Sequence, residues 1–395
     1  MALTINIPDA LRRSVEAASG GLNTVLYTAK GQPSYMRVVP LRTLQSFSGQ
    51  NLGTGTHPAF VVGGADKANL FLGLCPGCVK NGELLSLPGV DPAHSANHDT
   101  FVAYARACGT GWHAMTNPEW ALLGHLCYEA AHLPGGNNNY GQHESTGQYG
   151  VRADTGLPAI GGSGAGITRT LTGSGPTFWR HDNTPFGISD LNGNVWEWSP
   201  GMRVNAGEIN IIVNNDAALN ATDLGASSAA WYAIDGATGA LVAPGTAGTV
   251  KYATSGTADY TLVRASGNSF EGMTNPGGNL VGATALALLK AHGCFPVAAS
   301  GLEGVINYFV NVAKVQPRDP CPALSASDPN AVVAVTAEGD YVTILTRREL
   351  PYADDPSKSY TTTWFDTWRF VDGKADEHWD PATIAPPPSP EPCAR

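Results

Sequence analysis

The sequence has little charge for its length, and several kinds of segment are missing from it. Lys and Arg together number 23 and Asp and Glu 33 among 395 residues, so 14% of the residues are charged, against about 25% in an average soluble domain. The formal net charge is −10, and the basic residues are scattered singly or in pairs. This distribution excludes a basic stripe that would neutralise nucleic-acid phosphates. No apolar run reaches the roughly 18 residues of a membrane-spanning helix, so none is predicted.

The N-terminus and the cysteines also exclude some classes. No basic region followed by an apolar one opens the chain, which predicts no signal peptide and synthesis in the cytosol. Seven cysteines are an odd number over a long chain, a poor basis for a disulfide framework. Cys75 and Cys78 suit a redox pair or half of a zinc site, but no second pair completes a tetrahedral site. Most of the cysteines are therefore expected to be buried thiols.

Turn-forming and hydrophobic residues, in contrast, are plentiful. The chain has 47 Gly and 28 Pro, and 43% of its residues are hydrophobic, which predicts a folded protein with many turns. Periodic apolar residues and helix stop signals predict helices at 8–18, 99–108, 117–132 and 281–291. The third helix has the clearest start, because Thr116 and Glu119 have the spacing of a capping box.

Two short motifs on either side of a Gly- and Asn-rich stretch are the most specific features. The first reads Gly-Trp-x-x-x-Thr-x-x-Glu-Trp at 111–120, and the second reads Gly-Asn-Val-Trp-Glu-Trp at 193–198. Together they resemble the signature of the formylglycine-generating-enzyme (sulfatase-modifying factor) branch of the C-type-lectin-like fold. The resemblance covers roughly residues 95–371 and implies an α+β fold with twisted antiparallel strands, two helices and long loops. We expect a strand at 195–198 and place four tryptophans in the core, namely Trp112, Trp120, Trp196 and Trp198.

The sequence differs from the catalytic members of this family at their metal-binding residues. Formylglycine-generating enzymes bind copper through two cysteines a few residues apart, whereas Cys294, Cys321 and Cys393 are widely separated. Related iron-dependent sulfoxide synthases carry a three-His motif, and His94 and His98 have only part of its spacing. The resemblance therefore implies that the protein is not an enzyme and has no catalytic residues. A metal-dependent oxidase or oxygenase of this fold is the alternative.

Other segments resemble the non-enzymatic branch, which includes tail-fibre adhesins and tropism determinants of bacteriophages. They are the stretch Gly-Gly-Asn-Asn-Asn-Tyr-Gly at 135–141 and the motif at 182–194. The resemblance implies a virion protein, made in the bacterial host cytoplasm, that binds a host-cell receptor, a glycan, as a homotrimer. Its partners would be other virion proteins and the receptor, with no nucleic acid and no membrane insertion. A capsid-decoration or head-fibre protein is a further alternative.

Binding by such a protein depends on aromatic and amide side chains in loops, which can stack on sugar rings and bind hydroxyls. The candidates are Asn137, Asn138, Asn139, Tyr140, Trp179, Trp231, Tyr232, Tyr352 and Trp364. The resemblance also implies a structural Ca²⁺, held by oxygens of Asn192, Asn194 and Glu197, since such ligands suit a hard cation. Alternatively, Glu197 accepts hydrogen bonds from backbone N–H groups within a buried turn. No other cofactor is expected.

Composition along the chain predicts its organisation. Residues 1–90 contain short β-like runs and no recognisable chemistry, which favours an N-terminal segment for attachment or oligomerisation. The C-type-lectin-like domain is expected over 91–375, with inserted loops at about 202–265. Residues 376–395 are rich in proline and are predicted to form an extended tail.

Overall fold

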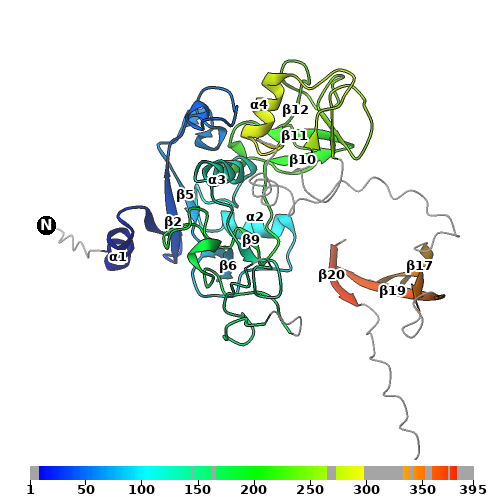
Figure 1. Ribbon diagram of the computed structural model, residues 1–395, viewed down its shortest axis with the longest axis horizontal. Coiled ribbons are helices and arrows are strands. Elements are labelled where there is room, and N and C mark those ends of the chain that lie inside the picture. The colour runs from blue at the N-terminus through cyan, green and yellow to red at the C-terminus, as the bar shows by residue number, and fades with distance from the viewer. Residues whose placement is uncertain are drawn as a thin grey trace, which may run out of the picture. The chain divides into compact units, whose positions relative to one another are not determined.

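The computed structural model describes residues 9–144, 146–161, 166–264 and 273–297, with the backbone of strands between 332 and 379 (Figure 1). Contacts divide the chain into two compact units, Met1–Pro317 and Arg318–Arg395. The described residues form four α-helices and several small sheets, so the predicted α+β class is confirmed.

Helix α1 (Ala10–Ser19) is delimited by its caps. Asp9 accepts a hydrogen bond of 3.0 Å from the backbone N–H of Arg12, and Gly20 ends the helix in the left-handed conformation. The chain then forms an antiparallel sheet in the order β1-β2-β5. Its strands are Asn23–Tyr27, Pro33–Pro40 and Asn69–Gly73.

Three short strand pairs complete the first part of the fold. Two are antiparallel, β3 (Val61–Val62) with β4 (Ala65–Asp66), and β6 (Gly77–Lys80) with β7 (Glu83–Ser86). The third is parallel and joins distant segments, β8 (Gly136–Asn137) and β9 (Asn192–Gly193). Glycine is required in this last pair because a Cβ on Gly136 would overlap the carbonyl of Asn192.

Helices α2 (His98–Arg106) and α3 (Asn117–Glu129) confirm the predicted helices in this region. Thr116 and Glu119 form the predicted capping box, in which each side chain satisfies a backbone N–H at the helix start. Helix α3 packs against β2, β5 and the segment 58–60 in one core. Because this core joins residues 39–72 to residues 120–191, residues 9–90 belong to the same compact unit as the segment that follows.

A second core lies between helix α4 (Ala283–Ala291) and a seven-stranded sheet. The strands are β10 (Met202–Asn205), β11 (Glu208–Ile212), β12 (Trp231–Ile234), β13 (Leu241–Val242), β14 (Lys251–Ala253), β15 (Thr261–Arg264) and β16 (Met273–Thr274). Helix α4 confirms the predicted helix at 281–291. That residues 202–265 are an insertion into a lectin-like domain stays a prediction.

The C-terminal unit contains an antiparallel sheet in the order β17-β18-β19-β20. The strands are Val332–Glu338, Tyr341–Pro351, Ser359–Val371 and Lys374–Trp379. The division at 317/318 falls inside the domain predicted over 91–375, and β20 extends into the start of the predicted tail. The rest of that tail lies outside the described residues.

The predicted strand at 195–198 is wrong. Strand β9 ends at Gly193, and Asn194 has a left-handed backbone with φ of 64°, which turns the chain out of the extended conformation. The side chain of Trp196 is 71% exposed, so its placement in the core is also wrong, whereas Trp120 is buried as expected. Trp112 and Trp198 are partly buried, and the indole N–H of Trp198 donates to the carbonyl of Ala96 at 3.1 Å.

Candidate functional site

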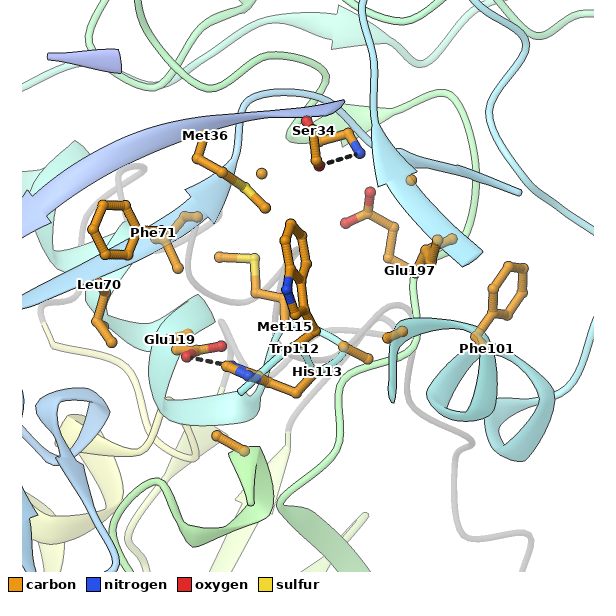
Figure 2. Close-up of a pocket in the computed structure, with 18 of the residues that line it drawn as sticks. Ser34, Met36, Leu70, Phe71, Phe101, Trp112, His113, Met115, Glu119 and Glu197 are labelled. Carbon is orange, nitrogen blue, oxygen red and sulfur yellow. Dashed lines mark hydrogen bonds and ion pairs between the residues drawn. The ribbon is translucent and has the colours of Figure 1, made fainter. Parts of the chain in front are cut away.

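A cavity of about 780 Å³ lies within the first unit (Figure 2). Strands β2, β5 and β7, helix α2 and the start of α3 contribute to its wall. Both sequence motifs do so as well, through residues 111–115 and 119–120 of the first and residues 195–198 of the second. The two segments that carry the family resemblance therefore meet at one hollow.

Most of the side chains around this cavity are apolar or aromatic. Figure 2 shows them around the indole of Trp112: Met36, Leu70, Phe71, Phe101 and Met115. Trp196 also lines the cavity and is largely exposed, which places it at the rim. Small-molecule sites have this character, with an apolar wall and a few polar groups.

The first polar group is the carboxylate of Glu119, which is fully hydrogen-bonded. Its Oε1 accepts from His113 Nε2 at 2.8 Å and from Asn215 Nδ2 at 2.9 Å, and its Oε2 accepts from the backbone N–H of Thr116 at 2.8 Å. Burial raises the pKa of Glu119, but these donors, led by His113, outweigh that effect and leave the pKa lowered. Glu119 is therefore an ionised group that links the helix start to the cavity wall.

The charge on His113 follows from its two partners. Its Nε2 faces the Glu119 carboxylate, and its Nδ1 lies 3.1 Å from the carbonyl oxygen of Gly111. Both partners are acceptors, so the ring satisfies both only when each nitrogen carries a proton. Burial lowers the pKa of His113, but Glu119 outweighs it and the pKa is raised. His113 and Glu119 thus form an ion pair whose charges cancel.

The second polar group, Glu197, differs from the first in having no partner. It lines the cavity and makes no hydrogen bond or ion pair with the described part of the chain. In Figure 2 its carboxyl group points inward, on the side of the Trp112 indole. Burial, with a smaller contribution from the charge of Asp190, raises the pKa of Glu197 to about 8. At neutral pH Glu197 is therefore mainly an uncharged carboxylic acid.

Three of the predicted glycan-binding residues, Trp179, Trp231 and Asn137, are buried. Trp179 is fully buried, and Trp231 is buried with its indole N–H donating to the carbonyl of Gly225 at 2.9 Å. The Asn137 amide is bonded within the loop, since Nδ2 donates to the carbonyl of Thr168 at 2.8 Å and Oδ1 accepts from the Gly141 N–H. These buried side chains expose little surface to a ligand, and their role in glycan binding stays a prediction.

The other predicted residues have different positions. Asn138, Tyr140 and Tyr232 are exposed, with Tyr140 at 50%, and Asn139 is partly buried. Trp364 lies in strand β19, and Tyr352 lies outside the described residues. Of the seven whose side chains the structure describes, none lines the cavity, and the sequence interpretation did not predict this cavity. The sequence signal for the cavity is the pair of tryptophan-rich motifs, whose tryptophans the sequence analysis places in the core.

The amide groups of the two predicted calcium-binding asparagines make hydrogen bonds within the protein. Asn194 Oδ1 already accepts hydrogen bonds from the Thr170 N–H at 2.8 Å and from Asn137 Nδ2 at 3.1 Å. Asn192 Nδ2 donates to the carbonyl of Pro134, and Glu197 faces the cavity. Among the described residues, no group of three or more His, Cys, Asp or Glu side chains could hold a metal ion. The calcium site stays a prediction, while backbone bonding by Glu197 is not seen in this part of the chain.

The cysteines are buried thiols wherever the structure describes them. Cys75, Cys78, Cys108, Cys127 and Cys294 are all buried. Burial raises the pKa of the Cys75 thiol to about 12, so it stays protonated and unreactive at neutral pH. Cys321 and Cys393 lie outside the described residues.

Two further findings frame the functional question. No helix in the ranges that the structure describes is both long enough and apolar enough to cross a membrane. A scan against protein-family models finds no match, and a search of curated proteins finds no similar chain.

Proposed function

We propose that the chain is a bacteriophage virion protein of the C-type-lectin-like fold that binds a host-cell receptor. It would belong to a tail fibre or another surface of the particle, and its receptor would be a glycan. The observation that supports this best is the cavity where the two motifs meet, since its wall offers aromatic faces and few titrating groups. Binding by rigid aromatic contacts needs such a surface, whereas catalysis needs reactive groups near one another.

The aromatic side chains of the cavity have the positions that ring stacking requires. Trp112 and Trp196 both line the cavity, and Trp196 is largely exposed, so a sugar entering the cavity would have two indoles on which to stack. The carboxyl group of Glu197 would bind a polar group of the ligand. Tyr140, beside strand β8, and Tyr232, in strand β12, are exposed and would supply further contact area.

Replacing Trp196 by alanine is expected to weaken glycan binding at least tenfold. The exposed ring makes a large contact with a ligand and little contact with the core, so its loss removes binding without unfolding the chain. The measurement is retention of the purified full chain on a panel of bacterial lipopolysaccharides and capsular polysaccharides.

A matched control for this substitution is Leu280→Ala, which truncates another exposed apolar side chain away from the cavity. Its binding should equal that of the wild type. If Tyr140→Ala abolishes retention and Trp196→Ala does not, the receptor binds the 138–140 loop instead of the cavity. Failure of the wild type to bind any polysaccharide of the panel would contradict the proposal.

Native mass spectrometry of the purified chain tests the assembly and the enzymatic alternative together. We expect a homotrimer, either free of metal or with calcium alone, because trimers are typical of the proteins that the motifs resemble. A monomer carrying one copper or iron ion would instead favour a metal-dependent oxidase, and Cys294, Cys321, His94 and His98 would then be examined as ligands.

A further inference from the structure

The charges around the cavity do not balance once Glu197 ionises. Four acidic or basic side chains line the cavity: Lys67, His113, Glu119 and Glu197. His113 and Glu119 cancel each other at 2.8 Å, and Lys67 is exposed to solvent. Glu197 is thus left as an acid without a counter-ion among the described residues.

The surroundings of Glu197 strengthen its preference for a positive charge. The carboxyl group of Asp190 is also buried, its charge contributes to the raised pKa of Glu197, and burial raises the pKa of Asp190 as well. The thiol of Cys75 also lines the cavity, but it stays protonated and contributes no charge. The indole of Trp112 lies on the side toward which Glu197 points, and aromatic faces attract cations.

We infer that this cavity selects ligands that carry an ammonium group on an apolar or sugar body, with Glu197 as the counter-ion and Trp112 as the aromatic wall. The inference rests on the proposed function, because it names the chemistry of the ligand that enters the same cavity. An ammonium group supplies a positive charge opposite the Glu197 carboxylate, and its N–H groups donate hydrogen bonds to the carboxylate oxygens. A neutral ligand of the same shape brings only the apolar contact.

Binding of an ammonium ligand exchanges one cation for another at Glu197. The carboxylic acid releases its proton to solvent, and the ammonium group takes the place of that proton beside the carboxylate. Because the pKa of free Glu197 is about 8, this release is unfavourable at lower pH. The affinity should therefore rise about 50-fold between pH 6 and pH 8, a range in which an alkyl ammonium stays charged.

The test uses phenethylammonium and its neutral analogue 2-phenylethanol, with calorimetric titration into the full chain. At pH 8 we expect the wild type to bind the ammonium probe at least about tenfold more tightly than the alcohol. Glu197→Gln should remove both this preference and the pH dependence while leaving binding of the alcohol unchanged. Glu144→Gln, which neutralises an exposed glutamate away from the cavity, serves as the control and should behave as the wild type.

The inference would be overturned if the wild type bound the two probes equally or bound neither of them. It would also be overturned if Glu197→Gln kept the preference for the ammonium probe. The wild-type pH profile is independent of any effect of the substitution on folding. Methyl glucosaminide and methyl glucoside form a second pair of probes, and preference for the former identifies an amino sugar as the source of the ammonium group. Polysaccharide retention that depends on Trp196 but not on Glu197 would leave the proposed function intact.

Discussion

Replacing Glu119 by alanine is expected to lower the free energy of unfolding by about 4 kcal/mol, because a buried charge pair loses one partner. The substitution leaves the imidazolium of His113 without its carboxylate and the amide of Asn215 without its acceptor. It also frees the backbone N–H of Thr116 at the start of α3. Each of these donors is desolvated and costs about 1–3 kcal/mol when it is left unpaired.

Urea unfolding followed by tryptophan fluorescence measures this effect. Glu144→Ala, an exposed glutamate, should change the free energy of unfolding by less than about 0.5 kcal/mol. A double-mutant cycle with His113→Ala isolates the pair, and removing both side chains should cost less than the sum of the two single losses. A cost below about 1 kcal/mol for Glu119→Ala would mean that the network does not stabilise the fold.

The start of α3 is also the part of the fold that the sequence predicts best. A capping box involves groups only three residues apart, so the pattern at Thr116 and Glu119 determines the local structure without help from distant segments. Helix α1 is similar, since Gly20 and Gly21 in the sequence mark its C-terminal end. The predicted ends of these helices differ from the observed ones by a few residues at most.

The backbone conformation of the second motif could not be predicted in the same way, because it depends on residues that are distant in the sequence. Alternation of Val195, Trp196, Glu197 and Trp198 is typical of a strand. The Asn194 side chain, however, bonds to Asn137 and Thr170 and accompanies a left-handed turn at this point. These partners lie 57 and 24 residues away, and nothing in the local sequence indicates them.

Burial of Trp179 has a related explanation. A tryptophan in a Gly- and Thr-rich stretch looks exposed from the sequence, but Gly135 and Gly175 both lie against its ring. A Cβ at Gly175 would overlap that ring, so the absence of side chains there makes room for the indole. The sequence shows the glycines without showing which ring they accommodate. For the same reason the cavity, whose wall comes from several separate segments, was not foreseen.

Acidification from pH 7 to pH 5 is expected to destabilise the protein by about 4 kcal/mol through two buried histidines. His57 Nδ1 accepts a hydrogen bond from the backbone N–H of Ala59, so the ring proton is on Nε2, which lies 3.1 Å from His125 Nδ1. An added proton on either acceptor nitrogen would break one of these bonds. Burial lowers the pKa of His57 well below 6.5 and that of His125 to about 3.

The sign of the effect follows from these lowered pKa values. The unfolded chain takes up protons below pH 6.5 while the folded chain does not, so stability is lost as the pH falls, by about 1.4 kcal/mol per unit for each histidine. His181, with a pKa lowered to about 4, adds to the loss, and His113, whose pKa is raised, opposes it. Urea unfolding between pH 7 and pH 5 should show a shallower slope for His125→Asn than for the wild type. His94→Asn removes an exposed histidine and should keep the wild-type slope, whereas equal slopes in all three proteins would show that the buried pair does not control acid stability.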